Sequence, residues 1–177
     1  HGDTAMKMDQ VCNKQDEYYT PRYAIEPILK YIPTNAHVLC PFDTHESYFV
    51  QSLMERMNRV SFSHIADGID FFEMDRPKAD YIVSNPPYSM KAEVFERLFD
   101  WDIPFAMLVG VVGLFESQRR FDMFKGNDFE VMYLNRRVSY FESYSDPKPK
   151  LNPPFSSVYI THKVLPQQIV FEEIVKK

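Results

Sequence analysis

The sequence predicts an α/β protein with a mostly parallel sheet, flanking helices and an antiparallel addition at one edge. Short apolar segments alternate with amphipathic ones through most of the chain, which is typical of parallel strands joined by helices. Residues 105–112 are apolar throughout, as in a strand buried on both faces. The last part of the chain contains patterns of strands only, which indicates the antiparallel addition.

The expected elements follow in order along the chain. Thr20 and Pro21 predict the N-cap and first position of a helix that runs to about Tyr31, and Pro33 ends it. Apolar residues at helical spacing predict the later helices, and alternating or continuous apolar runs predict the strands. We expect strands over 37–40, 60–65, 80–84, 105–112, 129–134, 138–141 and 157–164, and helices over 47–58, 91–99 and 115–124.

The composition is that of one globular domain. The chain has 177 residues, of which 45% are hydrophobic and 25% charged, and this length fits one domain. We expect a flexible polar lead-in over 1–17 and a single domain over 18–177. The five glycines form neither a G-x-G-x-x-G loop nor a G-x-x-x-x-G-K-[ST] loop, which excludes both common glycine-rich nucleotide motifs.

Charge, cysteine content and hydropathy exclude further classes. A net charge of −5 excludes a strongly basic nucleic-acid binder but leaves room for a local basic face. Cys12 and Cys40 are too few for a disulfide scaffold or a zinc site, so we expect no metal and a reducing compartment. The longest apolar run, 105–115, is too short to span a bilayer. We therefore expect a cytoplasmic protein with no membrane partner.

Polar segments follow three of the predicted strands. Residues 41–47 follow the first strand, 64–72 follow the second, and Asn85-Pro86-Pro87-Tyr88 follows the strand over 80–84. Ligand sites of parallel sheets lie outside the carboxyl ends of the strands. We therefore expect the three segments to meet in one site.

The segment Asn85-Pro86-Pro87-Tyr88 is suited to holding a planar amine. Two prolines cannot continue a strand or enter a helix interior, so they form a stiff turn. The Asn85 amide and the Pro86 carbonyl then act as two acceptors for an NH2 group such as the exocyclic amine of adenine. Tyr88 offers a face on which the base stacks, worth about 1–3 kcal/mol in single-strand binders. A plain strand-ending turn is the alternative interpretation.

This motif resembles the catalytic motif of S-adenosylmethionine-dependent amino methyltransferases. Those enzymes modify adenine N6 in DNA or RNA, and a related branch modifies the glutamine amide of release factors. Further segments resemble the cofactor and tail motifs of the same enzymes: 18–23, 39–47, 63–65, 70–72, 153–159 and 165–169. Together they resemble the EcoRI-type adenine-specific methyltransferase family, particularly its short phage-borne members.

The resemblance implies a fold, an activity and a set of site residues. The fold is the Rossmann-like methyltransferase fold, with a seven-stranded sheet and flanking helices. The activity is N6-adenine methylation of DNA with S-adenosyl-L-methionine as cofactor, in the host cytoplasm if a phage encodes the chain. The implied catalytic residues are Asn85, Pro86, Pro87 and Tyr88, and the implied cofactor-binding residues are Tyr19, Thr20, Pro41, Phe42, Asp43, Ser47, His64, Asp70, Phe71 and Asn85.

Alternatives stay open for the residues near the methionine part of the cofactor. Asp43 is a candidate partner of the methionine ammonium, but aspartate is also a common helix N-cap. Tyr19 or Phe42 is a candidate for a cation–π contact with the sulfonium, worth about 0.5–2 kcal/mol. In so aromatic a chain, the alternative for either ring is a place in the core.

The adenosine part has its own alternatives. The second strand ends without the carboxylate that usually binds the ribose, so His64 or Asp67 is the substitute. Asp70 is the candidate for the cofactor's adenine amine. Phe71 or Phe72 would stack on that adenine, and the other would belong to the core.

The partner also stays open between three interpretations. The chain has no separate target-recognition lobe, and its candidate phosphate contacts are Arg119-Arg120, Arg136-Arg137 and the stretch 146–150. The first interpretation is an enzyme acting on DNA. The second keeps the chemistry on RNA adenine or on a protein glutamine amide. The third is an inactive protein of this fold that binds a host protein.

Overall fold

The computed structural model of the chain describes residues 19–145 and 155–176. The expected lead-in over 1–17, the basic stretch 146–150 and the start of the 153–159 motif lie outside these residues. The helices are α2 (Arg22–Leu29), α3 (Tyr48–Glu55), α4 (Lys91–Trp101) and α5 (Gln118–Lys125), with 3-10 turns η3 (Ile65–Asp67), η4 (Phe71–Glu73) and η5 (Tyr88–Met90). The strands are β1 (His37–Cys40), β2 (Arg59–Phe62), β3 (Tyr81–Ser84), β4 (Phe105–Gly110), β5 (Glu130–Leu134), β6 (Ser157–His162) and β7 (Ile169–Glu172).

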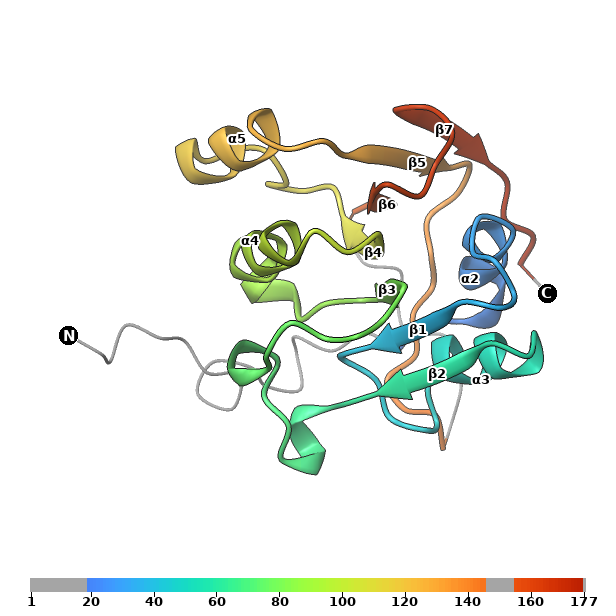
Figure 1. Cartoon of the computed structure of the whole chain (residues 1–177). Helices are drawn as coiled ribbons and strands as arrows, with labels where there is room; N and C mark the ends of the chain where they lie inside the picture. Colours follow the sequence, from blue (N-terminus) through green and yellow to red (C-terminus); the bar gives the residue numbers. More distant parts are fainter. Residues whose placement is uncertain (1–18, 146–154, 177) are drawn as a thin grey trace.

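The strands form one seven-stranded sheet in the order β2-β1-β3-β4-β6-β5-β7 (Figure 1). The first four strands pair in parallel. Strand β6 runs antiparallel to both β4 and β5, and β7 pairs parallel with β5. The expected α/β sheet, mostly parallel with antiparallel pairing toward one edge, is confirmed.

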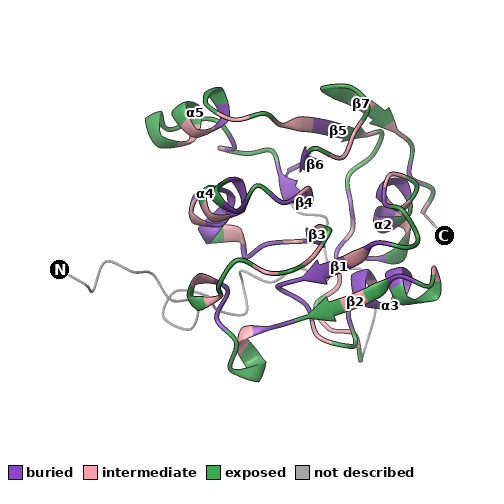
Figure 2. Ribbon diagram, in the orientation of Figure 1, coloured by how far each residue is buried: buried purple, intermediate pink, exposed green. Residues whose placement is uncertain are grey.

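Successive side chains of the central strands point to opposite faces of the sheet and contribute to two separate hydrophobic cores. Helices α2 and α3 cover one face of the sheet, where Val38 and Leu108 are buried. Helix α4 covers the other face, where Leu39 and Met107 are buried with Phe124 of α5. This two-sided burial explains the continuous apolar pattern of β4. Figure 2 shows β4 and β6 buried and the outer strands β2 and β7 largely exposed.

The sequence prediction was wrong at two strands. Residues 138–141 form no strand; Phe141 makes one isolated bridge with Tyr19, and the Ser139 N–H donates to the Tyr23 hydroxyl at 2.8 Å. The apolar pattern there reflects burial of Val138 and Tyr140 beside the sheet. Strand β7 was missed because its exposed, alternating residues lie on an edge where only β5 pairs with it.

Two helix starts also differ from the prediction. Helix α2 begins at Arg22 with Pro21 as its N-cap residue, so the expected Thr20 cap was wrong. Thr20 is buried, and its hydroxyl accepts a hydrogen bond from Asn85 instead. Helix α5 begins three residues later than expected, because the Ser117 hydroxyl caps it by accepting from the Arg120 N–H at 3.1 Å.

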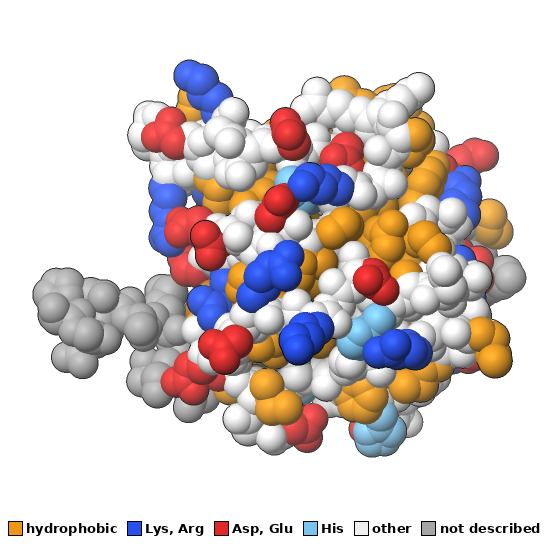
Figure 3. Space-filling model, in the orientation of Figure 1, with side chains coloured by type: hydrophobic (Ala, Val, Ile, Leu, Met, Phe, Trp, Pro, Cys, Tyr) orange, Lys and Arg blue, Asp and Glu red, His pale blue; other side chains and the backbone are white. Residues whose placement is uncertain are grey.

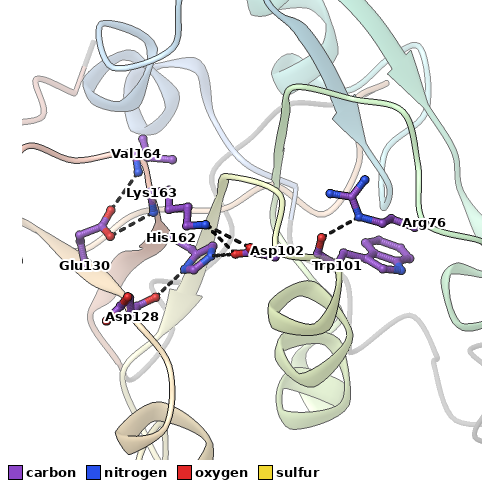
Figure 4. Close-up of polar contacts among 8 residues, drawn as sticks. All are labelled: Arg76, Trp101, Asp102, Asp128, Glu130, His162, Lys163 and Val164. Atoms are coloured by element: carbon purple, nitrogen blue, oxygen red, sulfur yellow. Dashed lines mark hydrogen bonds and ion pairs between the residues drawn. The ribbon is translucent and has the colours of Figure 1, made fainter.

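A polar cluster joins α4 to β6 beside the first residues of β4 (Figure 4). Asp102, the residue after α4, adopts a left-handed conformation with φ 54°. Its carboxylate accepts from His162 Nε2 at 2.7 Å and pairs with Lys163 Nζ at 2.9 Å. On the next strand, Glu130 accepts from the Lys163 and Val164 N–H groups at 3.1 and 3.0 Å. The cluster connects three elements at the end of the sheet opposite Gly110.

Candidate functional site

The three polar segments meet at the carboxyl ends of β1, β2 and β3. The Ser63 N–H, after β2, donates to the Cys40 carbonyl at 3.1 Å, and the Asp43 N–H donates back to the Ser63 carbonyl at 2.9 Å. From β3, the Ser84 hydroxyl donates to the Asp43 carboxylate at 2.6 Å. The loop after β1 is therefore bonded to both neighbouring strand ends.

Asp43 is a buried carboxylate that accepts hydrogen bonds from two serine hydroxyls. It is only 8% exposed, and its second oxygen accepts a hydrogen bond from the Ser47 hydroxyl. Ser47 occupies the N-cap position of α3, so the carboxylate orients the cap residue and is not itself the cap. Burying a carboxylate costs free energy that hydroxyl donors offset only in part. A cation bound beside Asp43 would lower that cost.

The segment after β2 forms two short turns capped by its own polar side chains. His64 is buried, and its Nδ1 accepts from the Ala66 N–H at 3.0 Å. Asp70 accepts from the Phe72 N–H at 2.9 Å. Asp67, the alternative to His64, is exposed. The caps hold both His64 and Asp70 at the carboxyl ends of the strands.

The aromatic residues of this region divide between core and surface. Phe71 is fully buried, with its ring centroid 4.8 Å from that of Phe42 and 5.2 Å from that of Trp101. Phe42 is also buried, directly after Pro41 in the loop that follows β1. Phe72 is half-buried. Of the pair considered for stacking on adenine, Phe72 therefore has the accessible ring, and Phe71 belongs to the core.

An aromatic cluster lies beside Asp43 and includes a residue that sequence reasoning missed. The Tyr144 ring lies 4.6 Å from the Tyr19 ring and 5.1 Å from the Tyr48 ring. Burial raises the pKa of the Tyr144 hydroxyl well above its usual value, and the negative charge of Asp43 raises it further. The signal in the sequence was the aromatic-rich run 140–144, whose position in space no local pattern reveals.

The Asn85-Pro86-Pro87-Tyr88 turn projects from the carboxyl end of β3. Its two prolines are buried, and Pro87 is the N-cap residue of η5. Asn85 Nδ2 donates to the Thr20 hydroxyl at 3.2 Å. This bond assigns the amide nitrogen to Thr20, so the amide oxygen is the atom that can accept from an incoming NH2 group. Thr20 therefore orients Asn85.

Tyr88 packs tightly against the end of β4. A Cβ at Gly110 would overlap the Tyr88 hydroxyl and lie 2.7 Å from Phe155 Cδ1. The Phe155 ring stands edge-on to the Tyr88 ring at 4.9 Å. Only a glycine at 110 permits this approach.

A small pocket lies between this turn and the end of β4. Its lining residues are Asn85, Pro86, Tyr88, Lys91, Val109, Gly110, Tyr140 and Phe155, and its volume is about 10 Å³. That is room for about one water molecule. A base would enter only if lining side chains such as Tyr88 and Phe155 shifted.

Lys91 is the other residue of this pocket that sequence reasoning missed. It is the first residue of α4, only 5% exposed, and its Nζ donates to the Gly110 carbonyl at 3.2 Å. Burial, with the charge of Arg120 as a second cause, lowers the pKa of its ammonium group to about 8. A lysine at the first position of a helix is usually exposed, so nothing in the sequence indicated that Lys91 is buried.

The candidate phosphate contacts are dispersed. Arg119 pairs with Glu93 at 3.2 Å and with Glu96, and Arg120 donates to the Gly113 carbonyl at 2.6 Å. Figure 3 shows Lys and Arg side chains interspersed with Asp and Glu on the face drawn. Arg137 is exposed. On that face the basic residues form no continuous patch.

Two structural features are absent from the described part of the chain. Within residues 19–145 and 155–176, no cluster of His, Cys, Asp or Glu side chains is arranged to hold a metal ion. Within the same ranges, no helix has the length and apolar character that crossing a bilayer requires.

The comparison with known proteins identifies the class of fold. No protein-family model and no curated protein matches the chain. A solved structure, a modification subunit of a putative type I restriction enzyme from Vibrio vulnificus YJ016, matches it with a TM-score of 0.60 at 13% identity. The match covers 96% of this chain and 49% of that one, so the chain spans about half the length of that subunit. The chain has a Rossmann-like methyltransferase fold.

Proposed function

We propose that the chain is an S-adenosylmethionine-dependent methyltransferase whose acceptor is the N6 amine of adenine in DNA, in the manner of the EcoRI-type family. The observation that carries the proposal is the Asn85 turn at the end of β3, bonded through Ser84 to the buried Asp43 at the end of β1. In this proposal Asn85 would hold an amine and Asp43 a cation. They lie on a sheet of the methyltransferase type.

The residues present fit the proposed cofactor. Asp43 would take the methionine ammonium, because a buried carboxylate that accepts from the Ser47 and Ser84 hydroxyls gains further from a cation. Asp70 and the half-buried Phe72 would take the adenine, and His64 would take the ribose. The bound cofactor would supply an electrophilic methyl group on a sulfonium.

The catalytic contribution of the chain is positioning and electrostatics. The Asn85 amide oxygen and the Pro86 carbonyl would accept both N–H groups of the target amine, which leaves the nitrogen lone pair directed at the methyl group. Tyr88 would stack on the base after a shift of the pocket lining. In a duplex, the base must first leave the stack, at a cost of a few kcal/mol.

Asn85→Ala tests this function. We expect single-turnover transfer of labelled methyl to duplex DNA to fall at least about 10²-fold, the order seen when a single electrostatic donor is removed from an active site. Calorimetry should show cofactor affinity within a few-fold of the wild type. An Asn85→Ala variant that transfers methyl at the native rate contradicts the mechanism.

The substrate is tested in parallel assays. Wild-type protein is given labelled cofactor with duplex DNA, single-stranded DNA, RNA or a bacterial protein extract. We expect label in DNA that maps to N6-methyladenine. Label in RNA or in a protein glutamine would move the function to those amines, which share the planar NH2. Cofactor binding without transfer, together with a stable protein partner on pull-down, would favour the inactive host-binding alternative.

A further inference from the structure

Lys91 is a buried amine in the wall of the amine-holding pocket. Its Nζ lies 3.2 Å from the Gly110 carbonyl oxygen and 4.7 Å from the centroid of the Tyr88 ring. Asn85 and Pro86 line the same pocket of about 10 Å³. Among the described residues, no carboxylate forms an ion pair with Lys91. A lysine that is 5% exposed and lacks a counter-ion is costly to keep charged.

The groups around Lys91 also disfavour its charged form. Arg120, from α5, adds a second positive charge nearby. Of the residues that the structure describes, the remaining titratable groups of the pocket wall are the hydroxyls of Tyr88 and Tyr140. With burial as the larger cause, the pKa of Lys91 falls to about 8. At pH 7 about one tenth of the molecules would then carry a neutral amine there, against less than about a thousandth for an ordinary lysine.

We propose that Lys91, as a neutral amine, accepts the proton that the target amine loses on methylation. This inference rests on the proposed function and adds a catalytic residue outside the Asn85-Pro86-Pro87-Tyr88 motif. A neutral lysine has two N–H groups and a lone pair. One N–H can stay on the Gly110 carbonyl while the lone pair faces the pocket in which Asn85 and Pro86 hold the target.

The step balances in bonds and protons. The target nitrogen forms a bond to the methyl carbon with its lone pair, and the carbon–sulfur bond breaks with its electron pair left on sulfur. The nitrogen is then positively charged. One of its two N–H groups leaves its Asn85 or Pro86 acceptor, and that N–H bond breaks; the electron pair stays on nitrogen, and the proton moves to Lys91 Nζ. The new ammonium lies over the Tyr88 ring and against the Gly110 carbonyl, and it later returns the proton to water.

The charge on Lys91 sets the direction of the pH dependence. A protonated Lys91 has no lone pair, and its charge opposes the positive charge that develops on the target nitrogen. The rate of transfer should therefore rise with pH until Lys91 is neutral. We expect the single-turnover rate constant to rise about tenfold per pH unit below pH 8 and to level off above it.

Two substitutions separate proton transfer from positioning. Lys91→Met keeps the aliphatic stem, which favours folding, and should react about 10²-fold more slowly at pH 8.5 with a flat profile. Lys91→Arg keeps a cation over Tyr88 but cannot lose its proton, so it should be equally slow. Lys125→Met is the matched control, since Lys125 lies over the Phe121 ring on the surface; it should behave as the wild type. Native rates in Lys91→Arg would assign Lys91 a positioning role and overturn the proposal.

A second measurement needs no turnover. In protein labelled with carbon-13 at lysine Cε, the Lys91 signal is the one absent from Lys91→Met. We expect this signal to titrate with a midpoint near pH 8, whereas a midpoint near 10 would overturn the proposal. If the wild type transfers methyl and Lys91→Met shows the same pH profile as the wild type, the role of Lys91 is contradicted but the proposed function is not. Failure of the wild type to methylate any substrate contradicts the proposed function, and the role of Lys91 with it.

Discussion

Single residues in this protein carry roles that their immediate neighbours in the sequence do not suggest. Thr20 and Asp43 both precede a helix and are good N-cap types, yet neither caps. Thr20 accepts from Asn85 at 3.2 Å, and Asp43 accepts from Ser84 at 2.6 Å. Each joins segments more than 40 residues apart in the chain. The two residues connect the side of the site proposed to hold the cofactor to the side proposed to hold the target amine.

Gly110→Ala should damage both stability and transfer. The new methyl group would overlap the Tyr88 hydroxyl and crowd the Phe155 ring. Overpacking a buried site of this kind costs about 1–3 kcal/mol, and displacement of Tyr88 would remove the ring face proposed to stack on a base. Thermal denaturation and single-turnover assays measure the two effects. Gly126→Ala is the control with the smaller clash, because its Cβ would lie 3.2 Å from the Asp122 carbonyl oxygen, whereas a Cβ at position 110 would overlap the Tyr88 hydroxyl. Equal melting temperatures for the two variants would refute the crowding argument.

Secondary-structure elements were predictable where both sides of an element are covered. Strand β4 is buried at every position, and its predicted range, 105–112, ends two residues after the observed strand. Residues 138–141 have a similar apolar character but no neighbouring strand to pair with over their length. Strand β7 has a neighbour but exposes Ile169 and Phe171. Pairing depends on which segment lies alongside, and an apolar pattern does not encode that.

The α4–β6 cluster should contribute stability that depends on pH. Hydrogen bonds from His162, then from Lys163, hold the pKa of Asp102 below its usual value. A carboxyl group whose pKa is lowered on folding stabilises the fold above its unfolded pKa, near 4, and that contribution is lost as the pH falls further.

Asp102→Asn tests this cluster. Asparagine tolerates the left-handed backbone, so the substitution leaves the turn intact and removes the charge together with one acceptor oxygen. We expect the melting temperature to fall by roughly 1–3 °C at pH 7, and the difference from the wild type to shrink below pH 4. Glu26→Gln, at an exposed carboxylate of α2 on the other face of the sheet from α4, should show no such pattern. A difference that stays constant down to pH 3 would rule out the carboxylate as its source.

The whole molecule combines a methyltransferase fold with an acidic surface and scattered cations. Net charge is −5, and Arg119 is paired with glutamates. Affinity for a phosphate backbone depends on the number of cations that meet it and weakens with salt. Binding to DNA should therefore be weak at physiological ionic strength unless further cations contribute.

Cofactor binding should stabilise the entire fold. Binding only to the folded state at 100 times Kd contributes about 2.7 kcal/mol, which for a chain of this size raises Tm by roughly 5–11 °C. Thermal denaturation with S-adenosylmethionine measures this shift, and ATP, which shares the adenosine, serves as the control. Asp43→Asn should reduce the shift, because the ammonium loses its charged partner. No shift at millimolar cofactor would exclude the cofactor site.

The sheet, its two-sided burial and the stiff turn at Asn85 follow from local chemistry that the chain displays in order. Apolar periodicity and paired prolines restrict the backbone wherever they occur, so they can be recognised without knowing the fold. The orientation of Asn85 by Thr20, the burial of Lys91 against Tyr88 and the position of Tyr144 beside Asp43 depend on contacts between distant segments. Such contacts exist only once the strands have paired, and that pairing sets which polar groups lose water and which acquire partners.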